Sequence, residues 1–359
     1  MMKTLHYKII TLLLLTIPFL STANNDKGKY TKEKTIKKNF TVNANALLKV
    51  NNKYGNLNIT SWDQNRIEIE VHIKTSGNNE EKVQRKLDNI TVNFEGSSST
   101  VSAKTNIAKS SSWGWGNSNN VNMQINYTIK LPVKNNIDLT NDYGSITLDR
   151  IDGHATINCD YGRLDIGELR GRNNNLNFDY TSKSEIDYVN SAKINADYSG
   201  FTITKAGNLI LNTDYTSASI INAQDIDYTS DYGSISVNQA KNIKGSGDYI
   251  SIKLGKVNGN VTLDADYGSI KISELTENCG NVIINADYTG VKVGYNNNYN
   301  FKFNLKSSYG GISGVDNCNL SLKEVKNSQK NYKGSCGSEN SNNFVNITTE
   351  YGSISIHKN

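Results

Sequence analysis

The sequence repeats an Asp-Tyr dipeptide at intervals too short for a globular domain, and related Lys-Tyr, Ser-Tyr and Glu-Tyr pairs extend the series. These pairs end at Tyr54, Tyr143, Tyr161, Tyr180, Tyr198, Tyr215, Tyr232, Tyr249, Tyr267, Tyr288, Tyr309 and Tyr351. Successive tyrosines from Tyr143 to Tyr309 lie 17 to 21 residues apart. Such a period is typical of one coil of a solenoid. The 42 residues from Tyr309 to Tyr351 leave room for one further, degenerate coil.

Alignment on the tyrosine places apolar residues four positions before it and three, five and eight positions after it. Around Tyr143 these positions hold Leu139, Ile146, Leu148 and Ile151. Only Tyr228 and Gly245 interrupt the first row within the run of Asp-Tyr repeats. A spacing of two suits a strand with one buried face, and a spacing of three suits a corner. The pattern therefore predicts an all-β parallel β-helix whose coils, each about 4.8 Å thick, stack into a rod.

Composition excludes several other classes of protein. The chain has 2 Pro, 28 Gly and 20 Tyr in 359 residues, with 36% hydrophobic and 20% charged residues. These values exclude a multi-span membrane protein and a highly charged disordered chain. The net charge of +5 is weak for a nucleic-acid binder of this size, so no nucleic-acid partner is predicted.

The Asp-Tyr-Gly-Ser turns have a physical interpretation. Aspartate can accept hydrogen bonds from backbone N–H groups two residues on, and glycine at the third position tolerates positive φ. The tyrosine shares parity with the apolar residues before it, so we expect its ring at a corner of the core, stacked on its neighbours, with the hydroxyl reaching solvent. An outward ladder able to bind ligands is the alternative. The row of aspartates also raises calcium binding as a hypothesis, although the Gly-Gly-x-Gly-x-Asp repeat of calcium rolls is absent.

The first 23 residues are typical of a secretory signal peptide cleaved before Asn24. Lys3 and Lys8 precede an apolar run of about a dozen residues, shorter than the roughly 20 that span a membrane. The small residues Ser21, Thr22 and Ala23 end the segment. No Cys precedes Cys159, so a lipoprotein anchor is not expected. We therefore predict export to the periplasm, the outer-membrane surface or the medium, with no transmembrane segment in the mature chain.

Residues 24–131 are predicted to form an N-terminal cap that contains the first coil, and residues 132–359 the solenoid repeats. Within the cap, the spacing of Val83, Leu87 and Ile90 predicts a short helix over residues 79–90 that covers the open end of the solenoid. Residues 91–107 indicate a hairpin, and an alternating strand after residue 120 stops at Pro132. The Lys-rich segment 24–38 is expected to be frayed.

The four cysteines receive different interpretations. Cys318 and Cys336 flank a polar insertion, and an exported protein could oxidise them to a disulfide. Cys159 occupies a position where other coils have Ala, so we interpret it as a small core residue. Cys279 lies more than one coil away from Cys318, too far to bridge easily.

Several motifs together resemble those of the putative-adhesin family of exported bacterial β-strand-repeat proteins, the DUF4097 type. They are the Asp-Tyr-Gly-Ser turns, the segments 55–59, 62–63 and 67–69, and the Tyr-Thr-Ile-Lys-Leu-Pro segment 127–132. The resemblance covers nearly the whole mature chain and implies a right-handed β-helix in the cell envelope. Its motifs are structural and carry no established active site.

Signatures of catalysis are missing from the sequence. His72, His154 and His357 have no nucleophile or metal ligand at a useful spacing, and no catalytic or cofactor motif is present. We predict no catalytic residue, no cofactor and no metal. A polysaccharide lyase or hydrolase is the alternative function, because such enzymes use the same fold. Its best candidate residues are Arg150, Arg163, Arg170 and Arg172 with Asp149, Asp165 and Glu168, although Arg150 and Glu168 hold the same position in adjacent coils and should pair.

Trp113 and Trp115 form the only aromatic motif outside the repeat. Set among Ser, Asn and Gly, they could stack on a sugar or pack against the cap, and we name them as candidate ligand-binding residues. The sequence as a whole predicts a non-catalytic, adhesin-like protein of the cell envelope or surface. It would bind a glycan or protein through the polar faces of a β-solenoid.

Overall fold

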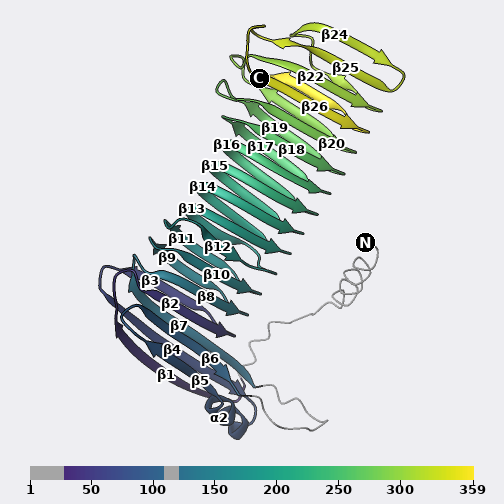
Figure 1. Ribbon diagram of the computed structural model, residues 1–359. Helices are drawn as coiled ribbons and strands as arrows, with labels where there is room; N and C mark the ends of the chain where they lie inside the picture. The colour runs from purple at the N-terminus through teal and green to yellow at the C-terminus, as the bar shows by residue number, and fades with distance from the viewer. Residues whose placement is uncertain (1–27, 109–120) are drawn as a thin grey trace.

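The computed structural model describes residues 28–108 and 121–359, and it confirms the predicted all-β solenoid (Figure 1). Each coil contributes one strand before its tyrosine and one strand after it. The strands before the tyrosines pair in parallel as a first sheet: β2 (Leu47–Lys53), β8 (Asn136–Asp142), β10 (Ala155–Asp160), β12 (Asn174–Asn177), β18 (Val261–Asp266), β20 (Val282–Asp287), β22 (Phe301–Ser308) and β26 (Phe344–Glu350).

The strands after the tyrosines pair in parallel as a second sheet. They are β3 (Leu57–Trp62), β9 (Ile146–Ile151), β11 (Leu164–Leu169), β17 (Ser251–Val257), β19 (Ser269–Leu275), β21 (Gly290–Tyr295), β23 (Ile312–Ser313) and β27 (Ile354–Lys358). In the middle of the column four long strands pass through the far corner and belong to both sheets: β13 (Ser184–Asp197), β14 (Gly200–Asp214), β15 (Ser217–Asp231) and β16 (Ser234–Asp248).

The predicted apolar rows fill the space between the two sheets. Leu139, Ile146, Leu148 and Ile151 are all buried, and residues of one row are register partners in neighbouring coils, as Leu139 and Ile157 are. One continuous core cluster therefore runs through the column. Because each coil is covered by its neighbours, the stability of a coil depends on the stacking.

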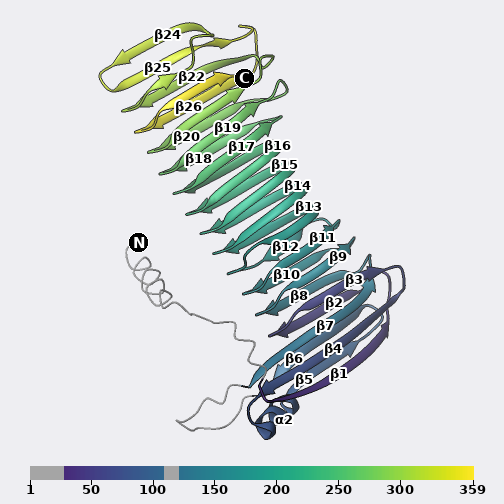
Figure 2. The same cartoon turned by 180° about the vertical axis from the view of Figure 1, so that it is seen from behind.

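An α+β cap covers the N-terminal end of the column (Figure 2). Beyond β3 lie β7 (Asn122–Pro132), β4 (Arg66–Gly77) and β1 (Tyr30–Thr41), and beyond β2 lie β6 (Thr100–Ile107) and β5 (Ile90–Gly96). The helix α2 (Glu80–Asp88) packs on β4, β1 and β5.

The structure contains most of the local elements that the sequence predicts for the cap. Val83 and Leu87 face inward from α2, Asn79 caps the helix through a 2.9 Å bond from the Lys82 N–H, and the 91–107 hairpin is present. The expectation that residues 24–38 fray is wrong for the part described, because Tyr30–Thr41 pairs along the whole of β4. The Lys-rich, alternately exposed side chains of this edge strand oppose pairing with another chain.

The C-terminal coils do not stack in the order of the sequence. Strands β26 and β27 insert between the coil of β20 and β21 and the coil of β22 and β23. The segment predicted to be a degenerate coil is instead an antiparallel hairpin of β24 (Asn319–Lys326) and β25 (Gln329–Cys336), and β25 pairs antiparallel with β22. This hairpin covers the last strand edge of the first sheet, and Cys318 and Cys336 form a disulfide beside it.

Candidate functional site

The twelve repeat tyrosines share one unusual backbone conformation. Their φ angles lie between 51° and 61°, in the left-handed region, whereas the glycine that follows several of them does not have positive φ. Our assignment of positive φ to the glycine is therefore wrong. The glycine is needed for close approach, since a Cβ on Gly144 would stand 1.9 Å from the carbonyl oxygen of Gly55 in the next coil. The tyrosine makes the turn, and its N–H still donates to the neighbouring coil, as from Tyr143 to the Asp160 carbonyl at 2.9 Å.

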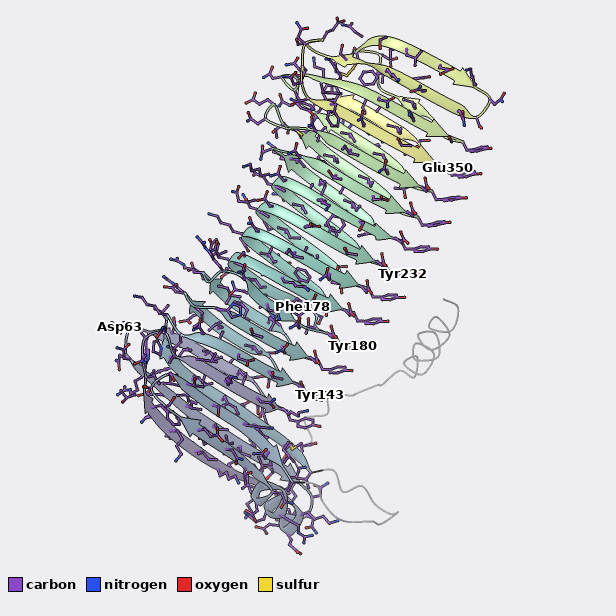
Figure 3. The ribbon with its side chains drawn as sticks, in the orientation of Figure 1. Asp63, Tyr143, Phe178, Tyr180, Tyr232 and Glu350 are labelled. Carbon is purple, nitrogen blue, oxygen red and sulfur yellow. A yellow bond between two sulfur atoms is a disulfide. The ribbon has the colours of Figure 1, made fainter. Side chains whose placement is uncertain are left out.

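This turn directs the tyrosine rings out of the molecule. Their exposed fractions range from 38% to 61%, and Figure 3 shows Tyr143, Tyr180 and Tyr232 projecting from the same edge of the column. The expected place at a corner of the core is wrong, because parity along a strand does not survive a left-handed residue. The expected stacking is confirmed. Consecutive ring centroids lie 4.7 to 5.2 Å apart with interplanar angles of 2° to 9°.

We call this row of twelve tyrosines the tyrosine ladder. In space its order is Tyr54, Tyr143, Tyr161, Tyr180, Tyr198, Tyr215, Tyr232, Tyr249, Tyr267, Tyr288, Tyr351 and Tyr309. Because each inner ring is covered on both faces, the ladder presents ring edges and hydroxyl groups to solvent. Burial first, and then neighbouring rings and aspartates, raise the pKa of Tyr180 and Tyr198 above the ordinary tyrosine value of 10.0. At neutral pH these two side chains are therefore neutral and can donate hydrogen bonds through their hydroxyl groups.

A row of aspartates runs beside the ladder. Their carboxylates accept hydrogen bonds from the backbone N–H of the aspartate in the next coil, for example from Asp197 to Asp179 at 3.0 Å and from Asp248 to Asp231 at 2.8 Å. The predicted acceptance from an N–H two residues on is not what these bonds show. Burial, followed by the charges of Asp231 and Asp266, raises the pKa of Asp248. In the described part of the chain no three His, Cys, Asp or Glu side chains gather into a group that could hold a metal ion.

Short polar side chains form a third row, three positions before the tyrosines. The amide groups of Asn158, Asn177, Asn195 and Asn212 donate one to the next at 2.6 to 2.9 Å. This row is absent from the predictions above, although Asn recurs at this position in the sequence. Asparagine, aspartate and tyrosine rows together make one polar strip along the edge of the first sheet.

The arginine-carboxylate group considered for catalysis is largely satisfied by internal ion pairs. Arg150 lies 2.8 Å from Asp152 and, as expected from their shared position, 3.8 Å from Glu168. Glu168 also lies 2.6 Å from Arg170, and Arg163 lies 3.4 Å from Glu185. Asp149, another of the candidate carboxylates, accepts a hydrogen bond from the backbone N–H of Ser61 at 2.8 Å. Two of these pairs, Arg150–Glu168 and Arg163–Glu185, join neighbouring coils, and the other two lie within one coil.

The other sequence-predicted residues have separate fates. Trp113 and Trp115 lie outside the described residues, as does the predicted signal segment 1–23. Cys159 is fully buried, as a small core residue should be. Cys279 is also buried, and it is a free thiol outside any disulfide. None of the helices in the described ranges is long and apolar enough to cross a bilayer.

Comparisons with known proteins assign this chain to no family. A search of family models and a search of curated proteins each find no match, so the DUF4097-type resemblance stays a prediction. Among solved structures, a putative adhesin from Parabacteroides merdae ATCC 43184 is 10% identical, with 90% of this chain and 96% of that chain covered and a TM-score of 0.34. A putative adhesin from Parabacteroides distasonis ATCC 8503 is 14% identical over 72% and 92% of the two chains, with a TM-score of 0.31. A putative cell adhesion protein from Clostridium sporogenes ATCC 15579 is 13% identical over 91% and 100%, with a TM-score of 0.20.

Proposed function

We propose that this chain is an exported, non-catalytic interaction protein of the cell envelope or cell surface, and that it binds its partner along the tyrosine ladder. The observation that carries the proposal is the conformation of the ladder. Twelve exposed tyrosines occupy a left-handed backbone position. Glycine and asparagine adopt that conformation most readily.

Stability alone does not account for this choice of residue. A non-glycine residue in the left-handed region costs about 1–2 kcal/mol. A stacked aromatic pair returns about 0.5–1.5 kcal/mol. The two effects nearly cancel in each coil, so the ladder adds little net stability. Strained residues that persist at an exposed position support a functional role for the surface that they create.

The chemistry of the strip suits a long polymeric partner. Phenol hydroxyls, amide groups and carboxylates recur every 4.7 to 5.2 Å along a rigid column, so one ligand unit can be bound repeatedly. Contacts that are weak one by one then add through multivalency. A glycan or an extended envelope protein would satisfy these donors and acceptors. Export is supported by the signal-like composition of residues 1–23.

The test replaces three central tyrosines, Tyr198, Tyr215 and Tyr232, with Asn, which tolerates the left-handed turn. We expect the variant to unfold at nearly the same temperature as the original and to lose at least tenfold in affinity for immobilised envelope extract.

The matched control places Ala on the opposite corner of the same coils. Lys205, Asn222 and Gln239 are register partners there, and their replacement should leave binding unchanged. Equal binding by the tyrosine variant and the original protein would contradict the proposal. Hydrolysis or elimination products from a polysaccharide panel would favour the enzyme alternative instead.

A further inference from the structure

The N-terminal end of the tyrosine ladder opens into a pocket of about 430 Å³. Tyr54 is the last ring at this end and stacks on Tyr143 with a centroid distance of 5.2 Å. Within the described ranges no ring stacks on its other face. On that side lie β7 and β4 of the cap, which supply the rest of the pocket: Lys74, Ser76, Asn122, Met123 and Gln124.

The register of the strands explains why the ladder stops here. Leu57 of β3 pairs with Tyr127 of β7, so Gln124 stands where the next ladder tyrosine would be, three residues before its partner. The chain does not turn at Gln124 but continues straight along β7, opposite Lys74 of β4. The space for a thirteenth ring is therefore left open beside Tyr54.

The groups around this space suit a neutral, ring-shaped ligand with a polar rim. Ser76, Asn122 and Gln124 make no side-chain hydrogen bond to any described residue, so their hydroxyl and amide groups are available. Lys74 is paired with Glu33 at 3.1 Å, which compensates its charge. Met123 also lines the pocket, and its side chain packs partly buried against the core.

We propose that this pocket binds one neutral hexopyranose, with a C–H face of the sugar stacked on Tyr54 and its hydroxyls bonded to Ser76, Asn122 and Gln124. This proposal rests on the proposed function for the role of the protein. It adds that the ligand at the N-terminal end of the tyrosine ladder is the end of a neutral glycan. An aromatic platform with convergent amide and hydroxyl groups binds such a ring by stacking and directed hydrogen bonds. The charged alternative, a uronic acid, is less suitable, because the one cation among the described lining residues, Lys74, is already paired with Glu33.

The experiment titrates the full chain with methyl hexopyranosides of the gluco, galacto and manno series and follows the methyl resonance of Met123 by NMR. For one sugar we expect saturable binding with a Kd that is roughly millimolar, as its small size allows. Tyr54→Asn should weaken that binding at least tenfold. Gln124→Ala should weaken it by a smaller factor while leaving the thermal unfolding temperature unchanged.

Matched controls separate this site from the rest of the ladder. Tyr309→Asn removes the ring at the opposite end, so it should leave the sugar titration unchanged. Methyl glucuronide should bind more weakly than the neutral sugar, and p-cresol tests whether any flat ring is accepted. The proposal is overturned if no hexoside binds, if p-cresol alone binds, or if folded Tyr54→Asn binds the sugar as before. The variant with Tyr198, Tyr215 and Tyr232 replaced should still bind the sugar. Its affinity for envelope extract tests the proposed function, and the sugar titration tests the pocket, so either proposal can fail without the other.

Discussion

Two core positions that break the apolar row compensate for each other. Tyr228 and Gly245 are register partners in neighbouring coils, between Leu211 on one side and Leu263 on the other. The Tyr228 ring is buried over Gly245, where an added Cβ would stand 2.1 Å from the ring carbon Cε1. The tyrosine thus occupies the volume that a second leucine would fill.

A double-mutant cycle tests this compensation. Gly245→Leu alone should cost about 3 kcal/mol, because it overpacks a filled core. Tyr228→Leu alone should cost about 2 kcal/mol, because it leaves a cavity over the glycine. Together they restore the leucine row, and because volume is then conserved the loss should be about 1 kcal/mol. The coupling free energy is then about 4 kcal/mol, above the usual range for contacting residues.

The assay is urea unfolding followed by circular dichroism, with hydrogen exchange of residues 209–213 and 243–247 as the local measurement. Local exchange is needed because a solenoid need not unfold in one step. The opposite result is additive losses, with a double variant about 5 kcal/mol less stable than the original protein. They would mean that the ring and the glycine do not share one volume.

Three further predictions follow from the same structure. Removal of the disulfide by Cys318→Ser and Cys336→Ser should destabilise the terminal hairpin by up to about 3 kcal/mol, because the bond closes a loop between cysteines 18 residues apart in the sequence. Faster hydrogen exchange of β24 and β25 would show this loss, and unchanged exchange would contradict it. Asp248→Asn should raise the unfolding temperature at pH 7, because the fold raises the pKa of this aspartate and its charged form therefore destabilises the folded state. Protonation of Asp248 at low pH should give the original protein the same gain. A lower unfolding temperature for the variant would count against this effect of the charge. The fold also raises the pKa of Tyr161, Tyr180, Tyr198, Tyr232 and Tyr288. The unfolded chain therefore loses these protons first, and the free energy of unfolding should fall as the pH rises through about 10. A free energy of unfolding that stays constant from about pH 9 to 11 would oppose this.

The repeating part of the fold could be predicted because its signal is local. Rows such as Leu139 and Ile157 recur at a fixed offset from a tyrosine, and the same offset places them in register in space. The helix α2 was also predictable, since its cap and its buried face lie within ten residues of one another. Period and parity are sufficient for features of this kind.

The direction of the tyrosines was not predictable from parity. Alternation assumes a continuous strand, and a single left-handed residue such as Tyr143 reverses the direction that the rule assigns. The sequence contains a glycine next to the tyrosine, which is the residue usually credited with positive φ. Only the backbone reveals that the glycine serves close packing instead.

The spatial order of the last coils was hidden for a different reason. The coil that ends at Tyr351 and the coil that ends at Tyr309 carry the same pattern, so either could follow Tyr288. Which one does is decided by long-range packing. The antiparallel hairpin β24–β25 covers β22, and β22 is thereby placed at the end of the column.

Oxidative footprinting can show whether the tyrosine ladder is the binding surface. Hydroxyl radicals label exposed tyrosines, and mass spectrometry measures the labelling of each ladder tyrosine with and without envelope extract. If the ladder is the binding surface, labelling of consecutive rings such as Tyr198, Tyr215 and Tyr232 should drop together, while exposed Ile221 on another face keeps its labelling. Protection of Ile221 with unchanged labelling of the ladder tyrosines would mean that the partner binds another face and that the ladder is not the binding surface.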